Sequence, residues 1–249
     1  MLEKSNTSNS DVIIYDLEDS VAPGSKHDAR DRLKAFLKLS LPQVQTVVLP
    51  KIHSAQDLHY ANRVIQRDVR IVASIESAKA MWNLGEIAGW KSEGGAEGGV
   101  LSGLLFAAED YCADTSIIRT KTRQELLYTR SQIAIAAKAF GVEAIDMVCI
   151  HYKDLEYLKD ECQDGRRLGF TGKQAIHPNQ VDTIQSTFVP TPQEITRAAK
   201  ILHQMKTAHA SEKGAIGLDG EMIDAPMIKQ AEGVVRIAKA AGLEIPTFD

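Results

Sequence analysis

The sequence predicts an α/β fold of the β/α-barrel kind, in which parallel strands alternate with helices. The chain has 249 residues, and one such barrel commonly occupies about 250. Short apolar runs rich in Val and Ile are continuous enough to be buried on both faces, as a parallel sheet requires. Each run precedes a longer segment with helical spacing, and this alternation is typical of α/β proteins.

Six apolar runs are expected to form the strands of this sheet, at residues 11–15, 46–49, 70–74, 100–105, 144–149 and 173–176. A closed parallel barrel of this type has eight strands, so two are unaccounted for. Only ten residues precede the first run, and only residues 39–44 separate the end of the first helix from the second run. Neither gap can hold a further strand and helix.

Capping residues mark where several helices begin and end. Ser25 and Ser54, each followed three residues later by Asp, are loose N-caps that predict helices after the first and second strands. A long helix is expected near residues 126–140, because apolar residues repeat there at helical spacing. Gly141 follows directly and is expected to end that helix.

The clearest helix start is a capping box formed by Thr191 and Glu194, with Pro192 in the first turn. Apolar residues follow at helical spacing: Ile195, Ala198, Ala199, Leu202 and Met205. We therefore expect an incomplete β/α barrel over residues 1–190 and a C-terminal helical extension or lid over residues 191–249.

The composition excludes several classes of protein. The formal net charge is -4 and no long basic cluster is present, so nucleic acid is not an expected partner. No apolar run approaches the ~20 residues of a membrane span, and the N-terminus has no signal-peptide pattern. The three cysteines lack CxxC spacing, which argues against a disulfide framework and a zinc site. We expect a cytoplasmic location by default, or a mitochondrial one if the N-terminus is incomplete.

Acidic residues follow most of the predicted strands. In β/α barrels the chemistry gathers at the carboxyl ends of the strands, and all of these ends lie on one rim. The residues that stand there are Asp16, Glu18, Asp19, Pro50, Lys51, Glu76, Glu109, Asp110, His177 and Pro178. Carboxylates brought together with too few basic partners either raise their pKa or bind a cation.

Oxygen ligands of this kind favour Mg²⁺ or Mn²⁺. Mg²⁺ typically takes one or two protein carboxylates and leaves its other positions to water and substrate. We therefore predict Glu76 and Asp110 as direct ligands, with Glu18 and Asp19 in the next layer. Each acid taken singly could instead cap the helix that follows its strand.

Two other residues of this rim keep two interpretations each. Lys51 could bind a substrate carboxylate, or it could only neutralise the acidic rim. His177 could act as a general base. A histidine before proline, however, is more often held in an extended turn by its backbone, and we favour this structural interpretation.

Six short segments of the chain resemble the citrate lyase β-subunit-like family of the HpcH/HpaI aldolase superfamily. They occur in the family's order and cover nearly the whole chain. The segments are VIIYDLEDSVAP at 12–23, VLPK at 48–51, IESA at 75–78, FAAED at 106–110, AIHPNQ at 175–180 and GEMIDAP at 220–226. The resemblance implies a TIM (β/α)8-type barrel.

The resemblance also implies a carbon–carbon lyase that depends on Mg²⁺, or on Mn²⁺ in its place. Such an enzyme cleaves a 3-hydroxyacyl thioester of the citramalyl-CoA, malyl-CoA or citryl type into an acyl-CoA and a 2-oxo acid. The family's metal ligands match Glu76 and Asp110, and its acid/base residue matches Asp224. Family members assemble as homotrimers or hexamers, in which this aspartate reaches the neighbouring subunit's site. Substrate and coenzyme A are then expected at Asp16, Glu18, Asp19, Lys26, Arg30, Lys51, Ile176, His177 and Pro178.

The chain departs from the family pattern in two places. The family's first strand, with a Tyr-Val-Pro-Gly turn, and its third strand, with an Arg-Val-Asn motif, have no counterpart here. In the family this arginine stabilises developing negative charge, and loss of such a group can cost ~10²–10³ in rate. Two hypotheses follow: an active lyase, or a non-catalytic truncated homologue or splice or gene-model fragment that retains metal or coenzyme A binding.

Overall fold

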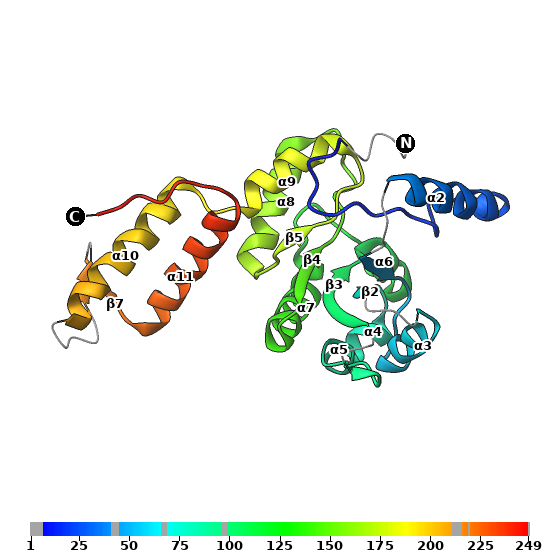
Figure 1. Ribbon diagram of the computed structural model, residues 1–249, viewed down its shortest axis with the longest axis horizontal. Helices are drawn as coiled ribbons and strands as arrows, with labels where there is room; N and C mark the ends of the chain where they lie inside the picture. The colour runs from blue at the N-terminus through cyan, green and yellow to red at the C-terminus, as the bar shows by residue number, and fades with distance from the viewer. Residues whose placement is uncertain are drawn as a thin grey trace. The chain divides into compact units, whose positions relative to one another are not determined.

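The computed structural model describes residues 7–40, 45–65, 69–95, 99–210, 216–218 and 220–248. The chain divides into two compact units, Met1–Gln185 and Ser186–Asp249, which we call unit 1 and unit 2. Figure 1 shows unit 1 with the parallel strands and unit 2 with the last two long helices. No helix in the described ranges is long and apolar enough to cross a membrane.

Unit 1 is built on one parallel sheet of five strands. They are β1 (Thr46–Leu49), β2 (Arg70–Ile75), β3 (Val100–Phe106), β4 (Glu143–Asp146) and β5 (Gly172–Lys173). Each strand pairs with the next one along the chain, as expected of successive strand–helix units. The α/β class is confirmed. In the part of the chain that the structure describes, no pairing joins β5 to β1, and the loss of two barrel strands stays a prediction.

Helices precede, connect and follow these strands (Figure 1). They are α2 (Lys26–Ser40), α3 (Ala55–Ile65), α4 (Ala78–Trp82), α5 (Leu84–Ala88), α6 (Ala108–Thr115), α7 (Leu127–Phe140), α8 (Leu155–Leu168) and α9 (Val181–Phe188), with the 3-10 turns η1 (Pro23–Ser25), η3 (Gln124–Leu126) and η4 (Pro178–Gln180). The predicted start of α3 and the predicted end of α7 are confirmed. Asp57 accepts a hydrogen bond from the backbone N–H of Ser54 at 2.9 Å, and Gly141 ends α7 with φ at +71°, a conformation that glycine adopts without strain.

The centre of the sheet explains the continuous apolar runs of the sequence. In β2 all residues after Arg70 are buried, and Ile71, Ala73 and Ile75 have no exposed surface. Burial on both faces removes the alternation of apolar and polar residues that marks a half-exposed strand. The strands predicted at 46–49, 70–74 and 100–105 are confirmed.

The strand predicted at residues 11–15 is wrong. This segment is not paired with any strand in the described part of the chain. Its apolar side chains are exposed, with Val12 at 64% and Ile14 at 44%. An apolar run forms a strand only where a neighbouring strand receives its backbone hydrogen bonds. The sequence pattern contains no information about that neighbour.

The last two predicted strands are shorter than expected. β4 ends at Asp146 and β5 ends at Lys173, whereas the apolar runs continue to residues 149 and 176. Beyond the strand ends, backbone groups form hydrogen bonds with a single side chain, that of Gln180. It donates to the carbonyl of Cys149 at 2.9 Å and accepts from the N–H of Ile176 at 2.9 Å. These groups therefore do not pair with a neighbouring strand.

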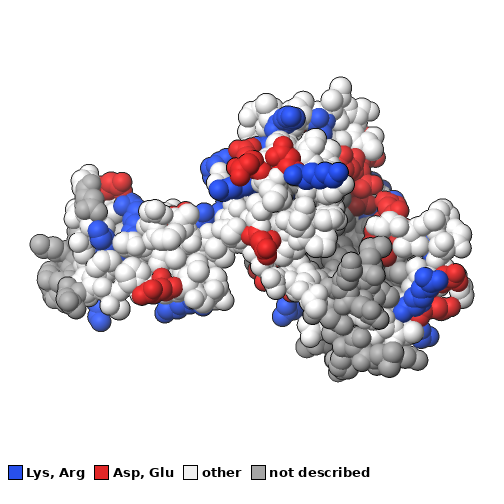
Figure 2. All heavy atoms as spheres, turned by 90° about the horizontal axis from the view of Figure 1, so that it is seen from above, with Lys and Arg blue, Asp and Glu red and all other residues white. Residues whose placement is uncertain are grey.

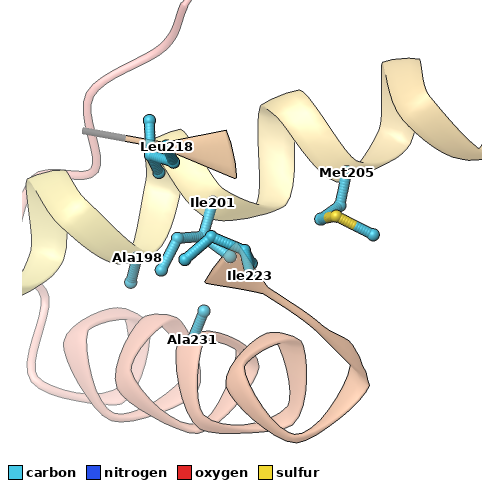
Figure 3. Close-up of a cluster of buried hydrophobic side chains, with 6 residues drawn as sticks. All are labelled: Ala198, Ile201, Met205, Leu218, Ile223 and Ala231. Carbon is cyan, nitrogen blue, oxygen red and sulfur yellow. The ribbon is translucent and has the colours of Figure 1, made fainter. Parts of the chain in front are cut away.

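Unit 2 consists of two helices and a short antiparallel hairpin. The elements are α10 (Pro192–Ala210), β6 (Ile216–Leu218), β7 (Glu221–Ile223) and α11 (Ala225–Ala240). Figure 3 shows how α10, the hairpin and α11 share one apolar cluster: Ala198, Ile201, Met205, Leu218, Ile223 and Ala231. The hairpin was not predicted, because strands of three residues show too little of the two-residue period.

The capping box at the start of α10 is confirmed. The backbone N–H of Thr191 donates to the Glu194 carboxylate at 2.7 Å, and the N–H of Glu194 donates to the Thr191 hydroxyl at 3.2 Å. Both exchanges satisfy amide groups that the first turn of a helix leaves without partners. Of the five predicted apolar positions, four are buried and Leu202 is partly buried.

Candidate metal and substrate site

Glu76 follows the carboxyl end of β2 and is 7% exposed. Its two carboxylate oxygens accept different hydrogen bonds, one from the backbone N–H of Lys51 at 2.7 Å and one from the Ser74 hydroxyl at 2.6 Å. Ser77 begins the next helix, since its hydroxyl accepts from the N–H of Ala80 at 3.1 Å. Glu76 is therefore fixed in a turn between a central strand and a capped helix.

Lys51 contacts the site through both its backbone and its side chain. Its φ of +54° is in the left-handed region, which non-glycine residues adopt at a cost. This conformation accompanies the N–H bond to Glu76, while the ammonium group forms an ion pair with Glu18. The hydrogen bond to Glu18, with the charges of Asp19 and Glu76, holds the pKa of Lys51 above its ordinary value.

The acidic segment after residue 15 folds into a turn around Asp16. The Asp16 carboxylate accepts from the N–H of Glu18 at 2.6 Å and from both the hydroxyl and the N–H of Ser20. Burial opposes ionisation of Asp16, but these hydrogen bonds and the charge of Lys26 outweigh it, so its pKa lies below the ordinary value. Asp16 thus shapes the turn, and Glu18 extends from it to Lys51.

The second predicted ligand begins a different helix. Glu109 and Asp110 are both in the first turn of α6, directly after β3. Glu109 forms an ion pair with Arg119. Asp110 is exposed, and no hydrogen bond or ion pair of its side chain occurs among the described residues. Of the acids on this rim, Glu18 and Glu109 therefore have basic partners, contrary to the expectation of unneutralised carboxylates.

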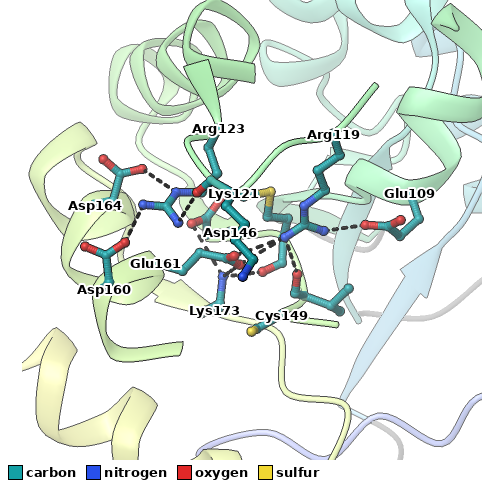
Figure 4. Close-up of polar contacts among 12 residues, drawn as sticks. Glu109, Arg119, Lys121, Arg123, Asp146, Cys149, Asp160, Glu161, Asp164 and Lys173 are labelled. Atoms are coloured by element: carbon teal, nitrogen blue, oxygen red, sulfur yellow. Dashed lines mark hydrogen bonds and ion pairs between the residues drawn. The ribbon is translucent and has the colours of Figure 1, made fainter. Parts of the chain in front are cut away.

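Behind Glu109 a group of charged residues, most of them buried, connects α7, α8 and the ends of β4 and β5. Figure 4 shows the side chains that form it, among them Arg119, Arg123, Asp146, Asp160, Glu161, Asp164 and Lys173. Glu161 has no exposed surface and binds Lys173 at 2.7 Å. Figure 2 shows acidic and basic side chains next to one another on the visible face as well. Sequence reasoning missed this group, because its members are far apart in the chain.

The residues expected to hold coenzyme A lie on α2 and at η4. Lys26 and Arg30 are one helical turn apart and share a face of α2. Ile176, His177 and Pro178 are exposed. The His177 ring accepts from the N–H of Asn179 at 3.2 Å and so caps η4, which agrees with the structural interpretation of this histidine.

Asp224 is the N-cap residue of α11 in unit 2. Its carbonyl accepts hydrogen bonds from the N–H groups of Met227 and Ile228, both at 3.1 Å, which are the first bonds of the helix. Its side chain forms no capping hydrogen bond and is exposed. An Asp at this position usually caps through its carboxylate, which here is left available.

A histidine that the sequence did not single out contacts Ser77, the residue after Glu76. The His53 ring and the Ser77 hydroxyl are 2.8 Å apart, and the His53 carbonyl accepts from Asn83 at 2.9 Å. Only the position of His53 directly before Ser54, which precedes α3, marked it in the sequence, and that position does not indicate this contact. A shallow hollow of about 380 Å³ in unit 2, lined by Pro192, Arg197 and Lys200, contains no candidate site residue.

The donor chemistry of Glu76 and Asp110 fits a hard divalent cation. In the described ranges no group of three or more His, Cys, Asp or Glu side chains could hold a metal ion, so a full protein cage is not formed there. Two carboxylates, one of them fixed and buried, match the one or two protein ligands that Mg²⁺ usually takes. Hydrogen bonds from Lys51 and Ser74 orient the Glu76 carboxylate, as outer partners of metal ligands do.

The sequence matches two families. Residues 34–178 match the HpcH/HpaI aldolase/citrate lyase family, and residues 116–243 match the C-C bond lyase family of the TIM-barrel fold. The mitochondrial citramalyl-CoA lyase of Rattus norvegicus is 30% identical, and the match covers 92% of this chain and 79% of that protein. A citrate lyase subunit beta-like protein of Deinococcus radiodurans is 31% identical over 93% and 90% of the two chains.

A solved structure has a similar fold. CitE from Mycobacterium tuberculosis, in complex with magnesium, acetoacetate and coenzyme A, superposes with a TM-score of 0.68. The two chains are 27% identical, and the superposition covers 90% of this chain and 88% of that one.

Proposed function

Because the chain belongs to the HpcH/HpaI aldolase/citrate lyase family, we propose that it is a Mg²⁺-dependent carbon–carbon lyase. Its substrate is a 3-hydroxyacyl thioester of the citramalyl-CoA, malyl-CoA or citryl type. Its products are an acyl thioester and a 2-oxo acid. Family relatives named as citramalyl-CoA lyase, and a neighbour crystallised with magnesium and coenzyme A, support this choice.

The observation that carries the proposal is the environment of Glu76. A carboxylate that is 7% exposed normally has a cationic partner, because burial of an unpaired charge is costly. Glu76 has two hydrogen-bond donors, but within the described residues no Lys, Arg or His forms an ion pair with it. A bound divalent cation, shared with Asp110, is the partner that its chemistry calls for. Mn²⁺ can replace Mg²⁺ at such oxygen ligands.

When bound, the Mg²⁺ ion supplies a Lewis acid that stabilises negative charge on the oxygens of the oxo acid. Lys51 and the acidic turn at Asp16, Glu18 and Asp19 border the same position and are proposed to orient the substrate. Lys51 already forms an ion pair with Glu18, so a substrate carboxylate would compete with Glu18 for the ammonium group. This exchange would couple substrate binding to a movement of the acidic turn.

Asp224 is proposed as the group that transfers the proton. When the carbon–carbon bond breaks, the hydroxyl group loses its proton to solvent and its carbon becomes the ketone of the oxo acid. The electron pair of the broken bond remains on the carbon next to the thioester. Asp224 then supplies a proton to the thioester carbon, and in the reverse direction it removes that proton. Its exposed carboxylate, which makes no capping bond, is free for this role.

Further parts of the assignment follow from the same proposal. Lys26, Arg30 and the turn of Ile176, His177 and Pro178 are proposed to hold the coenzyme A portion. The lyase is proposed to act as a homotrimer or hexamer, with Asp224 completing a neighbouring subunit's site. The helical extension is proposed to begin at residue 191. The free cysteines fit a reducing compartment, either the cytoplasm or the mitochondrion.

The test combines calorimetry with an assay. Mg²⁺ is titrated into the protein with and without a 2-oxo acid, and cleavage of citramalyl-CoA and malyl-CoA is followed. Glu76→Gln and Asp110→Asn should each lower kcat/KM by more than the roughly 100-fold that loss of an outer partner costs. Glu86→Gln, at an exposed acid of α5, is the control and should leave kcat/KM unchanged.

Two results would count against the lyase. Cleavage that survives both substitutions and removal of divalent metal would show that the site is misassigned. Binding of Mg²⁺ and coenzyme A without turnover would instead support the non-catalytic homologue.

A further inference from the structure

Arg119 connects the first turn of α6 to the buried interior of unit 1. One guanidinium nitrogen forms an ion pair with Glu109. The other donates to the carbonyl of Val148 at 3.0 Å and to both carboxylate oxygens of Glu161 at 3.1 Å. Figure 4 shows the Arg119 side chain extending between these two acids, with Glu109 on one side and Glu161 on the other.

The inner end of this connection is rigidly held. Glu161 and Lys173 have fully buried side chains and form an ion pair at 2.7 Å. Lys173 also donates to the carbonyl of Met147 at 2.6 Å, so the end of β4 is bound by both Lys173 and Arg119. A planar guanidinium with partners on two sides cannot rotate without losing hydrogen bonds. Arg119 is therefore a fixed support for whatever it binds at its outer end.

The interactions of Arg119 stabilise its charged form. Its side chain is only 9% exposed, and burial works against a charged guanidinium. The charges of Glu161 and Glu109 outweigh this effect and hold the pKa of Arg119 above its ordinary value. Arg119 therefore pairs with Glu109 as a charged guanidinium.

The outer end of Arg119 forms an ion pair with only one of two adjacent carboxylates. Glu109 and Asp110 are neighbours in the first turn of α6. Glu109 is occupied by Arg119, whereas Asp110 has no described hydrogen bond or ion pair and is exposed. Without Arg119 both carboxylates would be free, and the first turn of α6 would lose its attachment to β4 and α8.

We propose that Arg119 is a positioning residue for the metal site: it holds Glu109 and anchors the first turn of α6, so that Asp110 is the carboxylate left to bind the cation. The inference rests on the proposed function, because it assumes that Asp110 is a metal ligand. It assigns a role to a residue outside the ligand set, of the kind that outer partners of metal ligands perform.

The test measures binding of Mn²⁺ alone to the full chain, followed by the EPR signal of the free ion. Arg119→Gln should raise the Kd by about 10-fold or more, as is typical for loss of an outer partner. Arg119→Lys keeps the charge but not the planar fork and should raise the Kd less. Glu109→Gln can still accept a hydrogen bond from Arg119 and should change the Kd only a few-fold, whereas Asp110→Asn should abolish binding.

The matched control is Arg123→Gln. Arg123 is also buried, at 7% exposure, but pairs with Asp160 and Asp164. Within the described residues it has no hydrogen bond or ion pair with α6. Chemical unfolding of every variant separates a loss of stability from a loss of metal affinity. A purely structural role predicts that Arg119→Gln and Arg123→Gln lose stability together and bind Mn²⁺ equally well.

Whether Arg119→Gln raises or lowers the affinity for Mn²⁺ separates two explanations. Simple electrostatics predicts tighter Mn²⁺ binding when a positive charge is removed near the site, whereas positioning predicts weaker binding. Unchanged or tighter binding in folded Arg119→Gln, or in Arg119→Lys if the first variant does not fold, would overturn the inference. Loss of binding in Glu109→Gln equal to that in Asp110→Asn would also overturn it. Wild-type protein that binds no Mn²⁺ would overturn the proposed metal site and this inference with it.

Discussion

At the scale of single residues, the most consequential group is the buried set of charges behind the candidate site. Arg130 has 1% of its side chain exposed and binds both oxygens of Asp146, at 3.1 and 2.7 Å. Such a bidentate pair compensates for the loss of solvation that both charges suffer on burial. Removal of one partner would leave an unpaired buried charge, which typically costs ~3–5 kcal/mol.

The acid that links Arg123 and Arg130 predicts a pH effect. Asp164 binds both Arg130 and Arg123. Burial raises the pKa of Asp164, but the hydrogen bond and charge of Arg130, followed by those of Arg123, hold it below 3.8. A carboxyl group with a depressed folded-state pKa stabilises the protein above its unfolded-state pKa. That contribution is lost as pH falls through the folded-state value.

We therefore expect Asp164→Asn to lower the free energy of unfolding at neutral pH by about 1–2 kcal/mol, since partial exposure weakens the bonds to charged groups. The difference from wild type should shrink as the pH falls below 3.8. Urea unfolding across this range measures it. Glu156→Gln, at an exposed acid of the same helix, is the control. A difference for Asp164→Asn that is independent of pH would contradict the assignment.

Residue-scale sequence reasoning identified acids but not their partners. It placed Glu76 and Asp110 at strand ends, and the structure finds Glu76 directly after β2 and Asp110 in the first turn of α6. Arg119 was not predicted, because it lies in a loop ten residues beyond Glu109 and its second partner, Glu161, is 42 residues further on. A partner across such a distance is set only when the strands and helices pack.

At the scale of elements, close approach of α8 to β4 depends on one glycine. Gly165 is buried in α8, and a Cβ atom at this position would overlap a carboxylate oxygen of Asp146 and lie 3.3 Å from Arg130. Glycine is otherwise unfavourable inside a helix by ~1 kcal/mol relative to alanine. Its presence here is explained by the space that the Arg130–Asp146 pair requires.

Gly165→Ala should therefore destabilise unit 1 by about 1–3 kcal/mol, because overpacking displaces the ion pair. Gly85→Ala in α5 is the matched control, since nothing lies within 4 Å of a Cβ atom there. That substitution should be neutral or slightly stabilising. Denaturant unfolding of both variants measures the change in stability. Equal changes in the two variants would show that helix propensity alone determines the effect of the substitution.

The sequence predicted helices better than strands. A cap and a periodic apolar face are local features, so the start of α10 and the end of α7 were recognised from a few adjacent residues. A strand needs a neighbour that is distant in the chain. Residues 11–15 have the composition of a strand and remain unpaired, and β6 and β7 form a hairpin despite their short apolar runs.

At the scale of the whole molecule, the chain divides into two units with separate cores. In unit 2 the cluster around Ile201, which is 4% exposed, joins α10 to the hairpin and to α11 (Figure 3). Regions with separate cores can open independently, which hydrogen exchange detects. The two units are therefore expected to differ in their response to a substitution in one core.

Ile201→Ala should remove about 2–5 kcal/mol of stability from unit 2. Amide exchange measured by mass spectrometry should accelerate in α10 and α11 and stay unchanged in β2 and β3. Lys206→Ala, at an exposed position of the same helix, should leave both regions unchanged. Faster exchange throughout the chain in Ile201→Ala would show instead that the two units unfold as one.

The sequence by itself determined the α/β class, three of the strands in full, the capped helix ends and the family. These features depend on local composition, on spacing within one element and on short motifs. Only the tertiary structure decided which acids are neutralised by basic partners, and that residues 11–15 stay outside the sheet. Those outcomes depend on contacts between residues far apart in the chain, and folding alone brings such residues together.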